Sequence, residues 1–260
     1  MVHFFKQKTA ELFLITIFVS MVFSCCNRPD NDSWKHFIAH AGGAIDGINY
    51  TNSLEALNLS YSKGCRLFEL DLRLTTDGKI VAKHDPSKIT EAKFMSQLIH
   101  SKYTPLNMET INRWFRDHPD AILITDKIND PQKIYDEFLF PDRVIMELFS
   151  WEAVDKAIEL GIKPMVTGSL ILDNPDIEQI LEEKNIEYIC MNRKYGIPGN
   201  EDLLRRLKEK GIKNYVFHLE HPINEQPAEH YVWNNEMDFC YGMYANDLSL
   251  LDSLRKIKKQ

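Results

Sequence analysis

The chain has 260 residues, 44% hydrophobic and 27% charged, a length and composition at which a single α/β core closes without a second domain. Its formal net charge of -7 gives no overall field that attracts polyanions. No stripe of Lys and Arg with interleaved aromatic residues occurs in it, so we expect no nucleic-acid partner.

The first 25 residues have the pattern of an export signal. Two lysines precede an apolar stretch, Leu12 to Phe23, that is well short of the roughly 20 residues a membrane-spanning helix needs. Val22-Phe23-Ser24-Cys25 resembles the lipobox of bacterial lipoproteins, with Cys26 as a competing acceptor. We expect residues 1–25 to be a lipoprotein-type signal peptide and Cys25 to anchor the protein to a membrane in the bacterial periplasm or cell envelope. An ordinary cleaved signal or an uncleaved anchor is the alternative.

A polar, turn-rich run follows the signal, and we assign residues 26–35 to a tether and residues 36–260 to one domain. The five cysteines are too few and too scattered for a disulfide framework. Cys65, Cys190 and Cys240 lie in or beside apolar runs, so we expect buried thiols there. We expect the domain to be a monomer.

From Phe37 onward, short apolar or β-branched runs alternate with amphipathic stretches, as in a parallel sheet whose strands are joined by helices. This alternation predicts a TIM (β/α)8 barrel, in which reacting groups gather at the carboxyl ends of the strands. An open doubly wound sheet is the alternative, although no Gly-rich phosphate loop marks one. The expected strands are 37–41, 66–74, 121–127, 143–148, 164–167, 187–191, 214–219 and 240–245, and the expected helices are 53–63, 108–117, 131–138, 151–160, 175–184, 200–210, 226–234 and 247–257.

One interval departs from this alternation. Polar and apolar residues alternate along Glu69–Thr76, Asp77-Gly78 is a strong turn signal, and the chain then returns toward His84. A parallel crossover needs a dozen or more residues, so this link must be a β-hairpin that extends the second strand above the barrel mouth. A two-residue turn at Asp77-Gly78 places Asp71 directly opposite His84, with the other polar residues of the strand on the same face.

The hairpin and the first strand carry the candidate chemistry. Glu69 and Asp71, two apart on one strand face, can hold one hard cation, and oxygen-only ligands favour Ca2+ or Mg2+ over zinc. His40 ends the first strand, before two glycines that permit a tight turn near a ligand. Together with His84 it can divide the two proton transfers of phosphodiester hydrolysis. The alternative for the two carboxylates is an ion pair with Arg73 or Lys83.

Five motifs in this order resemble the opening signature of the glycerophosphodiester phosphodiesterases, within the phosphatidylinositol phospholipase C-like superfamily. A later stretch, Ile124-Thr125-Asp126-Lys127, is similar to the family's third acidic strand, and residues 241–247 are similar to its closing strand. The five motifs are His-Ala-Gly-Gly at 40–43, Thr-Asn-Ser-Leu-Glu-Ala at 51–56, Phe-Glu-Leu-Asp-Leu at 68–72, Thr-Thr-Asp-Gly at 75–78 and Lys-His-Asp at 83–85.

The resemblance implies roles for particular residues. His40 and His84 match the catalytic pair, and Glu69, Asp71 and Asp126 match the metal ligands. The family's arginine after the first histidine is Ala41 here, so Arg73 becomes the candidate phosphate-binding cation, and a solvated arginine is the alternative. The glutamate before the family's Asn-Thr pair is Thr51 here, while Asn52 is kept and is expected to contact substrate.

The third acidic strand also departs from the family pattern. The family's acid and lysine stand two apart, whereas Asp126 and Lys127 are adjacent and cannot both point inward on a regular strand. We expect Asp126 to point inward with Ile122 and Ile124, and Lys127 is a candidate substrate contact that a regular strand would turn away from the site. The segment from Pro86 to Asp120 is short for the insertion that many members carry, which implies an open mouth suited to a bulky or membrane-borne diester.

Three functions follow from these residues. The first is metal-dependent hydrolysis of a glycerophosphodiester, a small or lipid-derived substrate, to an alcohol and a phosphomonoester such as glycerol 3-phosphate. The second is a phospholipase C-like or sphingomyelinase D-like lyase that stops at a cyclic phosphate. The third, suggested by Ala41 and Thr51, is a non-catalytic binder of phosphorylated glycans or lipids.

Overall fold

The computed structural model describes residues 32–257. The predicted signal peptide, Cys25 and most of the tether lie outside the described residues. Within residues 32–257, no helix is both long enough and apolar enough to cross a membrane. Cys65, Cys190 and Cys240 are free thiols and buried, as predicted.

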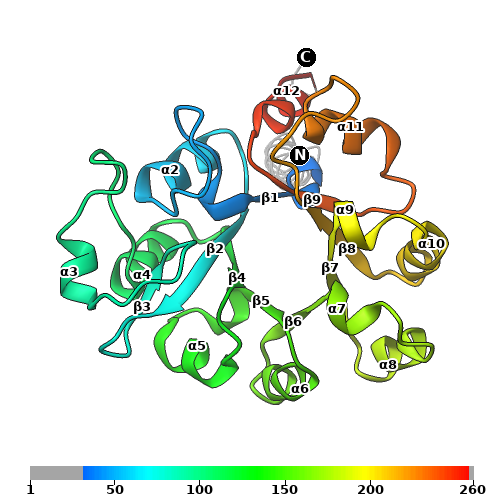
Figure 1. Ribbon diagram of the computed structural model, residues 1–260, viewed down its shortest axis with the longest axis horizontal. Helices are drawn as coiled ribbons and strands as arrows, with labels where there is room; N and C mark the ends of the chain where they lie inside the picture. Colours follow the sequence, from blue (N-terminus) through cyan, green and yellow to red (C-terminus); the bar gives the residue numbers. More distant parts are fainter. Residues whose placement is uncertain (1–31, 258–260) are drawn as a thin grey trace, which may run out of the picture. The chain divides into compact units, whose positions relative to one another are not determined.

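Eight parallel strands form a closed barrel with the helices outside it (Figure 1). Strand β1 pairs with β9 on one side and with β2 on the other, which closes the circle. The predicted TIM barrel is confirmed, and each expected strand is present within a few residues of its expected bounds. The strands are β1 (Phe37–Ala39), β2 (Leu67–Leu74), β4 (Ile122–Asp126), β5 (Val144–Leu148), β6 (Lys163–Thr167), β7 (Tyr188–Asn192), β8 (Lys213–Phe217) and β9 (Gly242–Ala245).

The eight expected helices are also present, and several begin at a polar cap. The side chains of Ser53, Asn107 and Ser150 each accept a backbone N–H three residues further on, which satisfies a donor of the first helical turn. These helices are α2 (Leu54–Ser62), α4 (Met108–Asp117), α5 (Pro131–Glu137), α6 (Trp151–Glu159), α8 (Ile177–Glu183), α10 (Glu201–Glu209), α11 (Ala228–Asn235) and α12 (Ser249–Ile257). Short pieces that the sequence did not predict are η1 (Asp32–His36), η2 (His40–Gly42), α3 (Glu91–Met95), η3 (Pro141–Arg143), α7 (Gly168–Ile171) and α9 (Arg193–Gly196).

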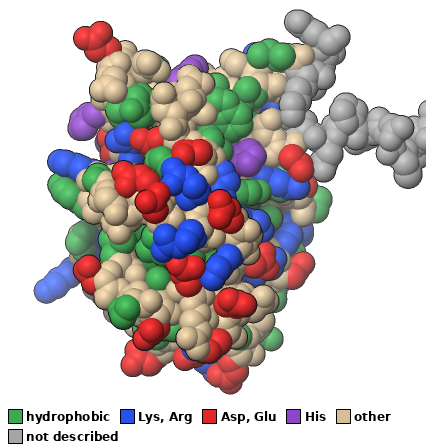
Figure 2. All heavy atoms as spheres, turned by 90° about the vertical axis from the view of Figure 1, so that its right-hand side faces the viewer, with side chains coloured by type: hydrophobic (Ala, Val, Ile, Leu, Met, Phe, Trp, Pro, Cys, Tyr) green, Lys and Arg blue, Asp and Glu red, His purple; other side chains and the backbone are tan. Residues whose placement is uncertain are grey.

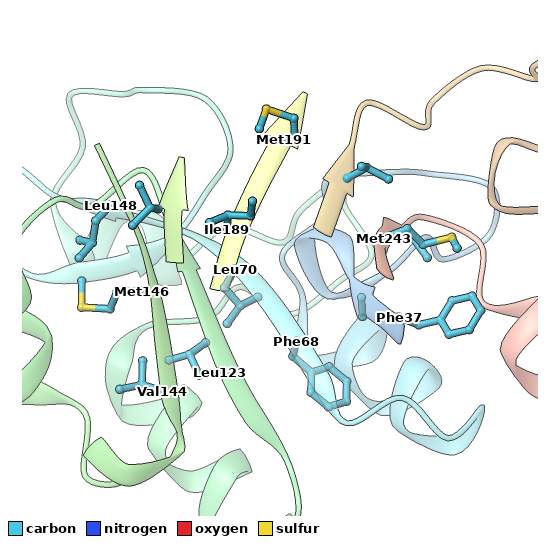
Figure 3. Close-up of a cluster of buried hydrophobic side chains, with 14 of the residues drawn as sticks. Phe37, Phe68, Leu70, Leu123, Val144, Met146, Leu148, Ile189, Met191 and Met243 are labelled. Carbon is cyan, nitrogen blue, oxygen red and sulfur yellow. The ribbon is translucent and has the colours of Figure 1, made fainter. Parts of the chain in front are cut away.

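Alternate residues of each strand face opposite sides, so the barrel has two apolar layers. The outer layer lies between strands and helices and includes Phe68, Leu70 and Met146 (Figure 3). The inner layer takes one residue from each barrel strand and fills the interior below the mouth. Its members are Ile38, Leu67, Ile124, Ile145, Met165, Cys190, Tyr215 and Tyr244.

The predicted hairpin is present, but its predicted register is wrong. Strand β3 (Ile80–Ala82) pairs antiparallel with β2 across a loop that spans Thr75–Lys79, longer than the expected two-residue turn. The partner of every strand residue therefore shifts by one. The N–H of Lys83, and not that of His84, donates to the carbonyl oxygen of Asp71 (2.7 Å). A one-residue shift turns side chains to the opposite face, so direct pairing does not bring His84 to the acids.

The outer face that includes α10 carries positive and negative side chains interleaved with one another (Figure 2). Arg206 pairs with Glu178 (2.9 Å), and Arg205 pairs with Asp238 (2.9 Å). These positive charges are thus paired locally, as on an ordinary solvated surface.

Candidate active site

Three carboxylates meet at the carboxyl ends of the neighbouring strands β2 and β4. Glu69 and Asp71 follow the inward-facing Leu67 at alternate positions, and Asp71 pairs in register with Asp126. One oxygen from each of the three carboxylates lies within 4.8 Å of the others. The structure therefore brings together the three acids that the sequence predicted as metal ligands.

Glu69 has the environment of a cation ligand. It is buried, and its Oε2 accepts the backbone N–H of Ala41 (2.6 Å), whereas its Oε1 has no hydrogen-bond partner among the described residues. A buried carboxylate oxygen without a partner is costly unless a cation or a proton meets it. Burial, with repulsion from Asp71 and Asp126, raises the pKa of Glu69 well above its usual value. The three-carboxylate set fits a hard divalent cation, which Glu69, Asp71 and Asp126 would hold.

Asn52 orients Asp71. Its Nδ2 donates to Asp71 Oδ2 (2.8 Å), and its Oδ1 accepts the Asp71 N–H (3.0 Å). Asn52 has a left-handed backbone (φ 46°), which asparagine tolerates better than most residues, and its side chain is fully buried. These two hydrogen bonds position Asp71, and the predicted contact of Asn52 with substrate stays a prediction.

Lys127 also reaches the acids. Strand β4 ends at Asp126, and Lys127 has a left-handed backbone (φ 66°) that returns its side chain toward the mouth. Its Nζ contacts the carboxylate of Asp126 and lies 3.6 Å from Asp71 Oδ1. Burial acts against the charge, but the surrounding carboxylates outweigh it and raise the pKa of Lys127. The assumption of a regular strand through Lys127 was wrong, and both side chains lie at the mouth.

His40 follows β1 at the tight turn that the sequence predicted. Gly43 has φ 93°, and a Cβ there would lie 2.2 Å from Ser60 Oγ, so this turn requires glycine. His40 Nδ1 donates to Asn246 Oδ1 (3.1 Å), which leaves Nε2 with a lone pair for the cavity. Burial lowers the pKa of His40, although nearby carboxylates act in the opposite direction.

His84 reaches the mouth by a bend after β3. Its Nδ1 donates to Asp85 Oδ1 (3.0 Å), and its backbone carbonyl accepts from Arg73 Nε (2.9 Å). Arg73 therefore fixes the backbone at His84 while its guanidinium lines the same cavity. The hydrogen bond from His84 holds the pKa of Asp85 below its usual value.

Tyr50 lies between the two histidines and was not predicted from the sequence. Its ring centroid is 4.8 Å from that of His40 and 4.5 Å from that of His84. Its hydroxyl donates to Glu220, in the loop after β8. Tyr50 directly precedes a recognisable motif, but Glu220 is 170 positions away and no local pattern connects the two.

Glu147 is a further buried acid that the sequence analysis missed. It lies on β5, and its Oε2 accepts the hydroxyl of Tyr244 (3.1 Å). Burial, with the charge of Asp126 nearby, raises its pKa to about 8. A signal was available, because Glu147 is the one carboxylate in Val144–Leu148 and stands two positions after the inward-facing Ile145.

These groups surround a cavity of about 450 Å³ at the barrel mouth. Five predicted residues line it, namely His40, Arg73, His84, Asp126 and Lys127. Glu69 and Asp71 are buried behind this lining, and Tyr50, Glu147 and Glu220 are among the other residues that line the cavity. The cavity thus joins two imidazoles, an acidic cation site and two cationic side chains in one space.

Comparisons with known proteins agree with this arrangement in fold. Solved structures with the same fold include a glycerophosphodiester phosphodiesterase from Parabacteroides distasonis, with 16% sequence identity and a TM-score of 0.66 over 86% of this chain and 98% of that chain. Another is a glycerophosphodiester phosphodiesterase from Thermotoga maritima, with 20% identity and a TM-score of 0.62 over 84% of this chain and 97% of that chain. A third is an Oleispira antarctica phosphodiesterase in complex with the product sn-glycerol-3-phosphate, with 14% identity and a TM-score of 0.64 over 85% of this chain and 96% of that chain. At these identities the likeness shows the fold alone, and no curated protein matches the chain by sequence.

Residues 40–101 match the model of the glycerophosphoryl diester phosphodiesterase family. The matched segment contains both histidines and the first two acids of the site, and it ends before Asp126. This match, together with the shared barrel, confirms the predicted resemblance of the chain to the glycerophosphodiester phosphodiesterase family.

Proposed function

We propose that this glycerophosphodiester phosphodiesterase-type enzyme uses a divalent cation and two histidines to hydrolyse a glycerophosphodiester to an alcohol and a phosphomonoester. The observation that carries the proposal is the convergence of His40, His84 and the three-carboxylate site on one cavity. The Oleispira antarctica enzyme with its bound product supports glycerol 3-phosphate as the phosphomonoester.

The oxygen-only ligand set favours Ca2+ or Mg2+ on Glu69, Asp71 and Asp126. Such an ion, when bound, supplies positive charge against the phosphoryl oxygens. Arg73 and Lys127 line the same cavity and supply further positive charge for the diester. In this role Arg73 replaces the cation that the family carries at the position of Ala41.

The surroundings of the two histidines favour different roles. His40 Nε2 carries a lone pair, because Nδ1 donates to Asn246, and burial favours the neutral ring, so His40 acts as the base that deprotonates the attacking water. His84 is backed by the carboxylate of Asp85, which compensates a proton on the ring, so His84 protonates the leaving alkoxide. The oxygen of water bonds to phosphorus as the bond from phosphorus to the alcohol oxygen breaks.

The test is a panel of glycerophosphodiesters, including glycerophosphocholine, assayed with chelated protein and with added Ca2+ or Mg2+. We expect turnover that requires the ion and a linear phosphomonoester in the phosphorus NMR spectrum. A cyclic phosphate as final product would favour the lyase. Binding without turnover under all conditions would favour the non-catalytic binder.

We also propose, from the sequence alone, export and membrane attachment through a lipid on Cys25. Metabolic labelling with a fatty acid should mark the wild type, and Cys25→Ala should leave an unprocessed or mislocalised precursor. Cys26→Ala is the matched control for a shifted cleavage site. A wild type that takes up no label would exclude lipidation.

A further inference from the structure

A second cavity, of about 340 Å³, adjoins the candidate active site. Tyr50 and His84 line both cavities. The centroids of these two rings are 4.5 Å apart, so together they form a partition between the two spaces. A group that extends from a phosphate held beside His84 therefore has a second space open to it, outside the barrel mouth.

The wall of this second cavity combines an apolar part with polar residues that include Lys83, Asp85 and Gln97. Its apolar side chains come from the segment after the hairpin and from the end of β3, and they are Ala82, Ile89, Phe94, Leu98 and Ile99. Phe94 is buried, yet it lies outside both apolar layers of the barrel. Leu98 is 56% exposed at the cavity, so its side chain is accessible to an apolar group bound there.

Hydrogen bonds hold this wall open. The N–H of Thr76 donates to the Ile89 carbonyl (2.9 Å), and the carboxylate of Asp77 accepts the Glu91 N–H (3.0 Å) at the start of α3. On the far side, Ile99 and Tyr103 exchange two backbone hydrogen bonds (2.8 and 2.9 Å) around a tight turn. The segment is thus tied to the hairpin loop and to itself, which gives a formed cavity and not a loose loop.

We propose that the second cavity binds a hydrocarbon chain of the substrate, so that the enzyme prefers a diester bearing one acyl or alkyl chain to a water-soluble glycerophosphodiester. This inference rests on the proposed function, because it places the phosphate beside His84. The two ester arms of the diester then lie on opposite sides of the Tyr50–His84 partition. The polar arm occupies the charged mouth, and the apolar arm lies along Ile89, Phe94 and Leu98.

A binding experiment tests the cavity without turnover. The probes are n-alkyl phosphates of four to ten carbons, which are monoesters, measured by calorimetry below their micelle concentrations. Affinity should rise roughly threefold for each methylene group until the chain fills the cavity. Leu98→Asp should abolish this dependence on chain length. Leu139→Asp, at a leucine that is 70% exposed and lines neither cavity, should leave it intact.

A second experiment identifies the arm that carries the chain and separates the inference from the proposed function. The substrates are glycerophosphocholine, an eight-carbon lysophosphatidylcholine and an octyl ester of glycerol 3-phosphate, all monomeric. At least one chain-bearing diester should exceed glycerophosphocholine about tenfold or more in kcat/KM, and Leu98→Asp should remove the advantage. Equal turnover of all three substrates, or an affinity for alkyl phosphates that does not depend on chain length, would overturn the inference. Neither result would contradict the proposed hydrolysis. If the affinity for alkyl phosphates rises with chain length but no diester is turned over, the second cavity binds a hydrocarbon chain and the proposed hydrolysis is refuted.

Discussion

The active-site cavity has two walls that differ in how the sequence encodes them. The first wall runs from β1 to Lys127 and carries every residue that the sequence predicted. The second wall runs from β5 to β9 and supplies Glu147 and Glu220. Asn246, in the loop after β9, contacts the site through His40, and none of these three residues was predicted. In the first wall the charged groups line the cavity or form the three-carboxylate site directly behind its lining. On the other side polar groups hold other residues in place, as Glu220 holds Tyr50 and Asn246 holds His40.

This difference shows what a local motif can reveal. In the first wall, residues close together in the sequence, such as Glu69 and Asp71, would bind the same cation, so their spacing predicts the site. In the second wall, each residue acts through a partner about one hundred or more positions away, as with Tyr244 and Glu147 or Asn246 and His40. Substitutions in the first wall should therefore abolish most of the activity, whereas substitutions in the second wall should change the rate and its pH dependence by smaller amounts.

The largest effect is expected from removal of a first-wall ligand. Asp71→Asn removes a negative charge with little change of shape and should lower kcat/KM on the order of 1,000-fold at limiting metal. Excess Ca2+ or Mg2+ should restore part of the rate, which a titration of rate against metal concentration measures. Asp155→Asn, on the outer helix α6, is the control. An Asp71→Asn enzyme with wild-type metal dependence would remove Asp71 from the site.

Loss of either histidine should cost somewhat less. His40→Ala and His84→Ala should each lower kcat about 100-fold or more, as loss of a general acid or base does, with a smaller change in KM. Steady-state kinetics on glycerophosphocholine measure both values, and His221→Ala, outside the cavity, should have no effect. Near-normal turnover in either variant would exclude that histidine from proton transfer.

A second-wall substitution should tune the reaction without stopping it. Asn246→Leu removes the acceptor of His40 Nδ1 and should lower kcat about tenfold, with KM nearly unchanged. Asn246→Asp keeps an acceptor, but its charge favours the imidazolium, so the acidic limb of the pH profile should move to higher pH. Identical profiles for the two variants would contradict a positioning role for Asn246.

The smallest effect on rate, and a clear effect on stability, is expected at Glu147. Below the ordinary pKa of 4.5 both folded and unfolded chains hold its proton. As pH rises from there toward 8, the unfolded chain releases a proton that the folded chain retains, so the folded state loses stability. Relative to Glu147→Gln, the wild type should lose roughly 3 kcal/mol between pH 5 and pH 8, measured by urea unfolding. The exposed Glu152→Gln should show no such difference, and parallel pH curves for wild type and Glu147→Gln would refute the raised pKa of Glu147.

Several features of the first wall were predictable in kind but not in detail. Asp77-Gly78 correctly marked a hairpin, yet the Thr75 hydroxyl donates to Asp77 (2.6 Å) and accepts the Lys79 N–H (3.0 Å), which builds a longer loop. That loop shifts the register at His84. The alternation of side chains along a strand does not apply to Lys127, because β4 ends one residue earlier, at Asp126. Backbone hydrogen bonds determine where a strand ends, and the alternation of side chains in the sequence does not show this.

The second wall was predictable only in part. Glu147 follows the inward alternation of β5 and could have been found from it. Glu220 and Asn246 lie in loops, where no period assigns a direction to a side chain. Their partners are known only once the barrel has closed.

The closing seam of the barrel therefore has a consequence for folding. Strand β1 is three residues long, and it joins the two ends of the sheet by pairing with β2 and β9. The His40–Asn246 hydrogen bond at this seam spans 206 positions, so it carries a large loop-closure entropy and should form late. A nascent or truncated chain that ends before β9 holds the five opening motifs and the third acidic strand and still leaves His40 without its partner. Acquisition of full activity during refolding should then follow docking of the last strand, and not formation of the motif-bearing hairpin.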